Sequence, residues 1–195
     1  MPRLFSIAPA ISIKGRKFKG LRGFAGKPAH PPLTDIPVAA YVFAMVFDAV
    51  SFFAGSDSGV ARDAYVAGTW AIIAGAVVSV PTALTGFWDW LKSTPRGTQA
   101  WRTANWHMAV MLFVTALVVV DIVLRLGSAD AQVVPTSVLI LSVLAGSLVM
   151  YGSAYGGALV YDYGFNVETS GDHPVWHPSD RDVGPGEKAF PADQR

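Results

Sequence analysis

Four aspartates in this 195-residue chain lie inside or at the ends of apolar segments, where a charged side chain is costly. Asp48 and Asp121 fall inside two of these segments, and Asp89 and Asp162 end two others, each between two aromatic residues. A carboxylate in such a place generally marks a paired or functional position. The separation from Asp48 to Asp89 is 41 residues, and so is the separation from Asp121 to Asp162. We therefore expect the four acids to occupy related positions in the fold.

Two histidines stand beside the same segments: His30 precedes the first and His107 opens the third. Imidazole binds Zn, Cu and Fe, so two facing histidines near a carboxylate could hold a divalent metal or a haem b. The two prolines after His30 predict an extended segment there, which disfavours a ligand on a buried helix. The interpretation we adopt is that both histidines cap and cross-link helix starts through carboxylates such as Asp89, with no cofactor bound.

The composition indicates which elements position these residues. Of the chain, 52% is apolar and 15% is charged, whereas about a quarter of a soluble domain is charged. Four apolar segments reach the roughly 20 residues that a helix needs to cross a bilayer, and they lack the polar stripe of a soluble bundle. We therefore predict an all-α polytopic membrane protein with four transmembrane helices, spanning about residues 36–54, 65–87, 107–126 and 138–160.

Lysine and arginine predict the orientation of these spans, because they are enriched in cytoplasmic segments. Thirteen of the 15 lie in the N-terminal arm, in the connection 88–106 and in the C-terminal tail. The other two are Arg62 and Arg125. Both termini are therefore expected in the cytoplasm. The two short loops, residues 55–63 and 127–135, are expected outside.

The chain is expected to have three parts. Residues 1–28 form a basic cytoplasmic arm, in which we expect no cleavable signal peptide. Residues 29–164 form the four-helix transmembrane domain, and residues 165–195 form an acidic, mostly irregular cytoplasmic tail. The tail histidines His173 and His177 are each followed by proline, so they are not expected to share a helix face for metal binding.

Depth in the membrane sorts the polar residues into two candidate clusters. The cytoplasmic-side cluster, with Arg96 or Arg102 within reach, consists of His30, Asp35, Asp89, His107 and Asp162. The outer cluster, near Arg62, consists of Asp48, Asp121 and Arg125. Asp121 and Arg125 are four residues apart on one helix and should pair, so Asp48 needs a partner from the second helix or Arg125 itself.

The repeated separation of 41 residues has two explanations. One is that a two-helix hairpin is duplicated at an offset of 73 residues, which predicts a parallel repeat about an axis along the membrane normal. The other is a chance alignment, because the two halves otherwise share little identity. The spacing leaves both explanations open.

Several function classes are excluded or disfavoured. With no cysteine, the chain has no disulfide, iron–sulfur cluster, thiolate zinc site or nucleophilic cysteine. No glycine-rich phosphate loop and no Ser-His-Asp arrangement is recognisable, so we do not expect an enzyme. The spans contain few polar residues at mid-depth, which disfavours a transport path.

Several short motifs in order resemble the bacterial membrane-domain family called domain of unknown function 2231. They are His30-Pro31, Leu33-Thr34-Asp35-Ile36-Pro37, Phe47-Asp48, Thr85-Gly86-Phe87-Trp88-Asp89-Trp90, His107 and Gly156-Gly157-Ala158-Leu159-Val160-Tyr161, together covering residues 29–164. The resemblance implies a four-helix protein of the bacterial plasma membrane. Similar domains are sometimes joined to a Rieske-type iron–sulfur domain, which suggests a place near membrane electron transfer. This chain cannot hold such a cluster itself, because it has no cysteine.

These observations predict a non-catalytic integral membrane subunit or scaffold, accessory to a respiratory or other membrane electron-transfer complex. Its expected partners are the lipid bilayer and other membrane-protein subunits. Nucleic acid is not expected, because the basic arm is tethered at the membrane. The alternative is a membrane redox protein that binds haem b or a divalent metal through His30 and His107.

Overall fold

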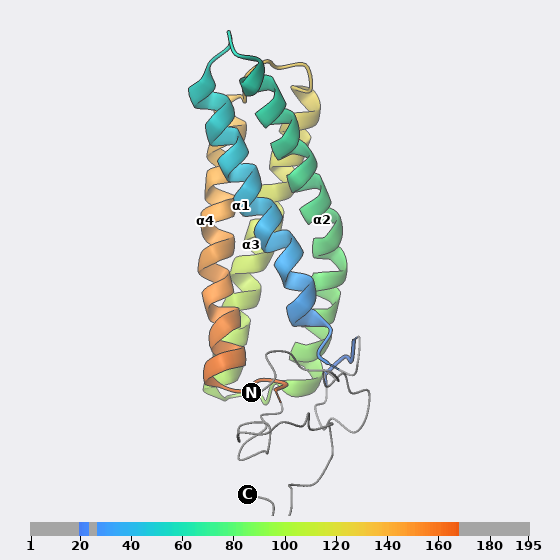
Figure 1. Cartoon of the computed structure of the whole chain (residues 1–195). Coiled ribbons are helices and arrows are strands. Elements are labelled where there is room, and N and C mark those ends of the chain that lie inside the picture. Colours follow the sequence, from blue (N-terminus) through green and yellow to red (C-terminus); the bar gives the residue numbers. More distant parts are fainter. Residues whose placement is uncertain (1–19, 24–26, 168–195) are drawn as a thin grey trace, which may run out of the picture.

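Four long helices form one bundle in the computed structural model, which describes residues 20–23 and 27–167 (Figure 1). The helices are α1 (His30–Ala54), α2 (Gly59–Ser93), α3 (Gln99–Gly127) and α4 (Thr136–Gly157), and a π-helical segment, η2 (Ala158–Asp162), continues α4. Successive helices run in opposite directions (Figure 1). The start of α1, the end of α2, the start of α3 and η2 therefore lie together, at what we call the His30 end. The opposite end is the Arg125 end.

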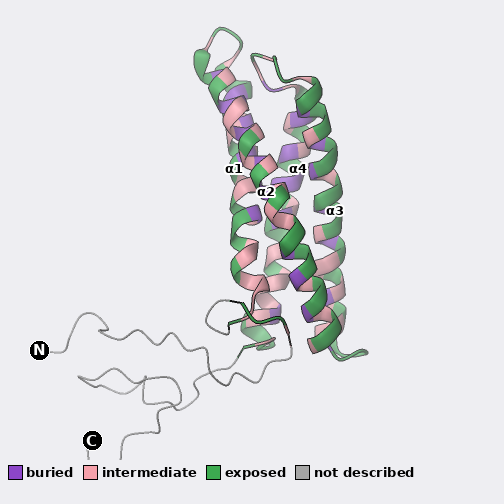
Figure 2. Cartoon of the chain, turned by 90° about the vertical axis from the view of Figure 1, so that its right-hand side faces the viewer, coloured by how far each residue is buried: buried purple, intermediate pink, exposed green. Residues whose placement is uncertain are grey.

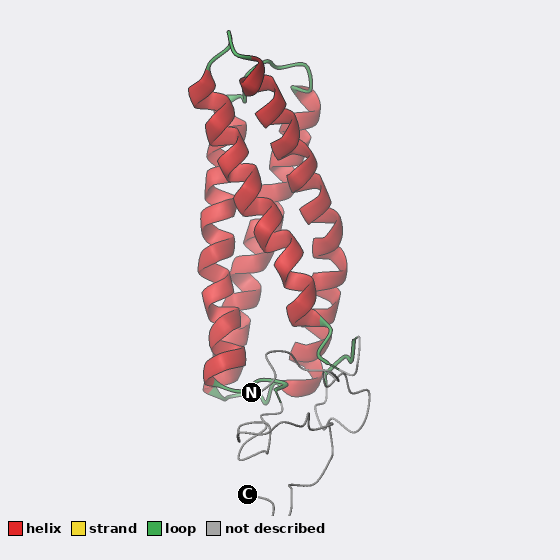
Figure 3. Cartoon of the chain, in the orientation of Figure 1, coloured by secondary structure: helices red, strands yellow, loops and turns green. Residues whose placement is uncertain are grey.

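All four helices are long and apolar enough to cross a membrane. Their lengths are 25, 35, 29 and 27 residues, with η2 counted as part of the last. Large apolar side chains cover the outside, and Phe53, Trp70 and Val77 are 84%, 68% and 66% exposed. Figure 2 shows the buried positions turned toward the interior of the bundle, and Figure 3 shows no strand in the described part of the chain. The prediction of an all-α protein with four transmembrane helices is confirmed.

The first helix begins earlier than predicted. We expected an extended segment at His30, but His30 is the first residue of α1 and Pro31 and Pro32 lie in its first turn. Proline is tolerated there because the first amides of a helix have no partner inside the helix. The extended segment was therefore a wrong prediction, and His30 is held on a helix.

A side chain of α2 hydrogen-bonds the backbone carbonyl that a proline leaves without a partner in α1. Pro37 has no N–H to donate to the carbonyl of Leu33 one turn earlier. The hydroxyl of Thr82 lies 3.3 Å from that carbonyl oxygen and 2.8 Å from the Val78 carbonyl oxygen of its own helix, so its one hydrogen is shared between the two acceptors. The backbone acceptor that Pro37 leaves free therefore becomes a contact between the first two helices.

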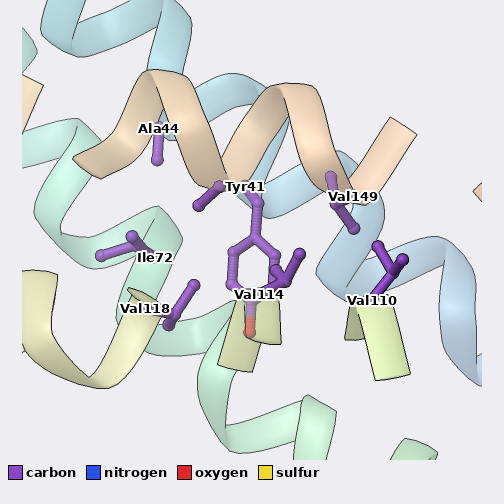
Figure 4. Close-up of a cluster of buried hydrophobic side chains, with 8 residues drawn as sticks. Tyr41, Ala44, Ile72, Val110, Val114, Val118 and Val149 are labelled. Carbon is purple, nitrogen blue, oxygen red and sulfur yellow. The ribbon is translucent and has the colours of Figure 1, made fainter. Parts of the chain in front are cut away.

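The centre of the bundle is an apolar cluster to which all four helices contribute. Tyr41 of α1 lies within it, beside Ile72 of α2 and Val114 of α3 (Figure 4). The remaining members are Ala44, Val110, Val118, Ala145 and Val149. The hydroxyl of Tyr41 hydrogen-bonds Ser79 of α2 at 2.7 Å, so the one polar atom of its side chain has a partner. The middle layer of the bundle is therefore closely packed, and the hydroxyl of Tyr41 is not left unpaired within it.

Glycines allow the helices to approach closely. A Cβ at Gly75 of α2 would lie 2.8 Å from Ala40 Cβ and 2.8 Å from Tyr41 Cε1 of α1. A Cβ at Gly146 of α4 would lie 3.0 Å from two atoms of Met45 of α1. Within a membrane such close packing contributes much of the attraction between helices, because lipid is as apolar as the side chains. The α1–α2 and α1–α4 contacts therefore require these small residues.

Gly75→Ala is expected to destabilise the bundle by about 1–3 kcal/mol, the usual cost of an extra methyl in a packed interior. The measurement is the free energy of unfolding in detergent micelles, followed by circular dichroism. Gly59→Ala is the matched control, because a Cβ there meets nothing within 4 Å. Equal stability of the two variants would contradict the close approach of α1 and α2 at Gly75.

Candidate functional site

Arg125 of α3 binds two aspartates inside the bundle. Its Nε donates to Asp121 Oδ1 at 3.0 Å, and its Nη2 donates to Asp121 Oδ2 at 3.4 Å. Nη1 donates to Asp48 Oδ1 at 3.1 Å, and Nη2 also donates to Asp48 Oδ2. The side chains of all three residues are fully buried. The guanidinium therefore joins α1 to α3 through two bidentate ion pairs.

Helix α2 completes the hydrogen bonding of Arg125. Nη1 donates to Thr69 Oγ1 at 3.2 Å, and Thr69 in turn donates to the carbonyl of Tyr65 at 2.8 Å. All five N–H groups of the guanidinium then have acceptors. The Arg125 Cζ also lies 5.6 Å from the centre of the Tyr65 ring, a cation–π distance. We call Asp48, Thr69, Asp121 and Arg125 the Arg125 cluster.

The loop between α3 and α4 is bound to α1 and α2 at the Arg125 end. Ser51 Oγ of α1 accepts a hydrogen bond from the Val134 amide at 3.0 Å. Arg62 of α2 donates to the carbonyls of Ala129 at 2.6 Å and Ala131 at 2.9 Å. These hydrogen bonds hold the loop against α1 and α2, and they give partners to the loop's backbone amide at Val134 and its carbonyls at Ala129 and Ala131. Arg62 therefore binds the loop, and its hydrogen bonds go to backbone carbonyls.

The structure brings the three residues of the outer candidate cluster together. Arg125 pairs with Asp121, and of the two alternatives for Asp48, a partner from the second helix or Arg125, the structure has Arg125. Sequence reasoning missed Thr69 and Tyr65, which adjoin the cluster, and Ser142 of α4, whose buried side chain lies beside Asp48. Neutral hydroxyl groups are common in transmembrane helices, so their positions in the sequence give no comparable signal.

The histidine pair, His30 and His107, lies across the bundle at the other end. The two ring centroids are 6.5 Å apart and the ring planes make an angle of 76°. His30 Nδ1 lies 2.9 Å from the carbonyl oxygen of Thr82, and His107 Nδ1 lies 2.8 Å from that of Gly152. Each histidine therefore binds the backbone of the next helix in the chain, α2 or α4. The expected cross-link through carboxylates such as Asp89 is wrong.

A glycine one turn beyond each of these carbonyls makes room for the imidazole. A Cβ at Gly86 would lie 2.6 Å from His30 Cε1, and a Cβ at Gly156 would lie 3.1 Å from His107 Cε1. The carbonyl and the glycine are thus four residues apart in both α2 and α4. The two histidine environments therefore repeat each other: the carbonyl and the glycine of α4, Gly152 and Gly156, each lie 70 residues after those of α2, Thr82 and Gly86.

The remaining residues of the cytoplasmic-side candidate cluster do not join the histidine pair. Asp89 is 4% exposed and accepts a hydrogen bond from the Leu21 amide at 2.8 Å. Asp35 and Asp162 are exposed. Arg102 donates to the carbonyl of Gly97 in the adjacent turn at 3.2 Å. Asp89 therefore attaches the segment before α1 to the end of α2, because a backbone amide, and not a histidine, is its partner.

The offset of 73 residues between the acids is not maintained at the His30 end. By the register of Gly86 and Gly156, the counterpart of Asp89 is Leu159. Asp162 lies three residues further along, at the end of η2. Asp89 is buried and Asp162 is exposed. The equal separations of 41 residues therefore do not correspond to equivalent environments.

Among the described residues, the two imidazoles are the only groups of a metal-ligand type that meet at the histidine pair. Within the described residues, no set of three or more His, Cys, Asp or Glu is placed to hold a metal ion. A closed structural metal site typically needs four protein ligands. Two imidazoles can therefore bind only a metal whose remaining ligands come from outside the protein, for example from a cofactor.

Four apolar membrane-length helices, an interior ion-pair cluster and two inward histidines define a four-helix integral membrane protein. Residues 26–169 match the family described as "Predicted membrane protein (DUF2231)". The match covers most of the chain, and the protein belongs to this family. Comparisons with curated proteins and with solved structures give no match.

Removing one side chain of the Arg125 cluster is expected to destabilise the protein in a defined order. Arg125→Ala strands two carboxylates and should cost about 3–5 kcal/mol. Asp48→Asn should cost more than Asp121→Asn, because Asp48 joins two helices whereas Asp121 pairs within its own helix. Unfolding in detergent micelles measures the order.

Asp57→Asn is the control for the loss of a carboxylate, because Asp57 is exposed in the loop between α1 and α2. Its effect should stay within about 0.5 kcal/mol. If Asp48→Asn were as mild as this control, the ion pair between α1 and α3 would not contribute to the stability of the bundle.

Proposed function

We propose that this protein is a non-catalytic integral membrane subunit or scaffold, accessory to a respiratory or other electron-transfer complex of the bacterial plasma membrane. The observation that carries the proposal is the use of the buried charges. All five N–H groups of Arg125 are bound to acceptors inside the bundle. The Arg125 cluster is therefore committed to holding helices together, and its guanidinium has no free donor with which to bind a substrate.

The exposed surface supports a role in association. The outward faces of the helices carry large apolar side chains along their lengths, among them Phe43, Leu84, Phe113 and Val123. Such faces contact either lipid or the helices of another subunit. The electron-transfer part of the proposal rests on the resemblance to domains that are joined to Rieske-type domains, and on no residue of this chain.

The orientation that we propose places the His30 end in the cytoplasm. Aromatic side chains gather at this end and are exposed: Trp88, Trp106, Tyr151 and Tyr161. Lys92 lies over the Trp88 ring, with its Nζ 5.1 Å from the ring centroid. Amphipathic rings and lysines favour the headgroup layer, and lysine favours its cytoplasmic side. The distribution of Lys and Arg in the sequence points the same way.

Purification in a mild detergent tests the accessory role. The full chain, tagged and expressed in its native host, is expected to co-purify with membrane subunits that carry redox centres, identified by mass spectrometry and visible spectra. An unrelated tagged four-helix membrane protein, purified in parallel, controls for carry-over. Recovery of the chain alone, as a monomer or as copies of itself, would exclude the accessory role.

Cysteine labelling tests the orientation, and the chain has no native cysteine to interfere. Ser56 lies in the loop between α1 and α2, and Pro95 lies in the loop between α2 and α3; both are exposed. A membrane-impermeant maleimide is expected to label Ser56→Cys in intact cells, and Pro95→Cys only after the membrane is opened. The reverse pattern would invert the proposed topology.

A further inference from the structure

The hydrogen bonds of the histidine pair fix the tautomer of each ring. A carbonyl oxygen only accepts hydrogen bonds, so each Nδ1 carries the hydrogen and donates it to Thr82 or Gly152. In the neutral imidazole, Nε2 then has a free lone pair. Among the described residues, nothing donates a hydrogen bond to either Nε2. A ring whose Nδ1–H is held by a backbone carbonyl is oriented as metal-binding histidines generally are.

The spacing of the rings matches two ligands of one metal ion. Imidazoles that bind an ion from opposite sides, with Nε2–metal distances of about 2.0–2.1 Å, have ring centroids roughly 6.3 Å apart. The centroids of His30 and His107 are 6.5 Å apart. The two rings come from α1 and α3, whereas the carbonyls and glycines that position them come from α2 and α4. All four helices therefore contribute to this spacing.

The number of ligands identifies the kind of metal centre. No third His, Cys, Asp or Glu of the described residues joins the pair, so a bare ion would lack most of its coordination shell. The iron of a haem already has four in-plane nitrogen ligands and leaves two axial positions on opposite faces. Two histidines on opposite helices supply what such an iron lacks.

The surroundings suit an apolar macrocycle. One turn further into the bundle from His107 are Val110 and Met111, which lie against Gly152 of α4. The layer next to the histidine pair is therefore apolar, as the macrocycle of a haem requires.

We propose that His30 and His107 are the axial ligands of a haem bound at the His30 end of the bundle. The site does not depend on the accessory role. A haem can bind to a chain that has no partner subunit, and a chain without haem can still be a scaffold.

Haem loading of the full chain tests the proposal. The protein is expressed with a haem precursor, purified in detergent and titrated with haemin in the apo form. About one haem per chain is expected, with the visible and electron paramagnetic resonance spectra of a six-coordinate low-spin iron. Binding by wild type that is no tighter than binding by the His30→Ala/His107→Ala double variant would overturn the proposal.

Variants distinguish ligation from a structural effect. His107→Ala is expected to lose the low-spin spectrum and to recover it with added imidazole, whereas His173→Ala/His177→Ala, the control in the tail, keeps it. His30→Met should raise the reduction potential, since His/Met ligation does so in cytochromes. A potential unchanged by His30→Met, in a protein that still binds haem, would exclude His30 as a ligand.

Metal analysis separates haem from a bare ion. The purified protein is analysed for bound metals before and after incubation with Zn²⁺ alone. Stoichiometric Zn²⁺ that is lost in His107→Ala, with no haem binding, would overturn the haem assignment. Co-purification of subunits with the His30→Ala/His107→Ala variant reports on the accessory role separately, because that variant keeps the outward faces of the helices and the Arg125 cluster.

Discussion

A guanidinium inside a lipid-embedded bundle has to be neutralised and fully hydrogen-bonded, because nothing else at that depth can solvate it. Arg125 meets this requirement with carboxylates from two helices and a hydroxyl from a third. Asp48 and Asp121 are likewise acceptable there because Arg125 lies between them. The rotation of α1 and α3 about their axes follows from this geometry, since any other rotation would turn a charge toward lipid.

The two ends of the bundle solve the same problem by different means. At the Arg125 end, charged side chains neutralise one another, so the contacts between helices are ion pairs. At the His30 end, neutral imidazoles bind backbone carbonyls, which bring no charge of their own. Carbonyl binding requires close approach of the rings to α2 and α4, and Gly86 and Gly156 permit it. The two histidines, each with a free lone pair, are suited to ligands, whereas the saturated Arg125 cluster is suited to stability. The buried carboxylate at the His30 end, Asp89, is bound by the Leu21 amide.

The sequence pattern of the acids was only partly informative. The offset of 73 residues relates Asp48 to Asp121, which share one arginine, so the separation reflects a real spatial relation at that end. At the other end the same offset pairs a buried Asp89 with an exposed Asp162. The histidine environments repeat there instead, with different offsets. Because a helix turns about 100° per residue, a shift of three residues moves a side chain to another depth and another face.

Hydropathy and local spacing were sufficient for the four helices and for the pair Asp121–Arg125, because both depend on residues close together in one helix. The contacts between helices required the folded structure: Asp48 with Arg125, and His30 with the carbonyl of Thr82. In a membrane the outward and inward faces of a helix are both apolar, so periodicity does not mark the inner face. Backbone carbonyls are present at every position, so the sequence carries no sign of which one a histidine will bind.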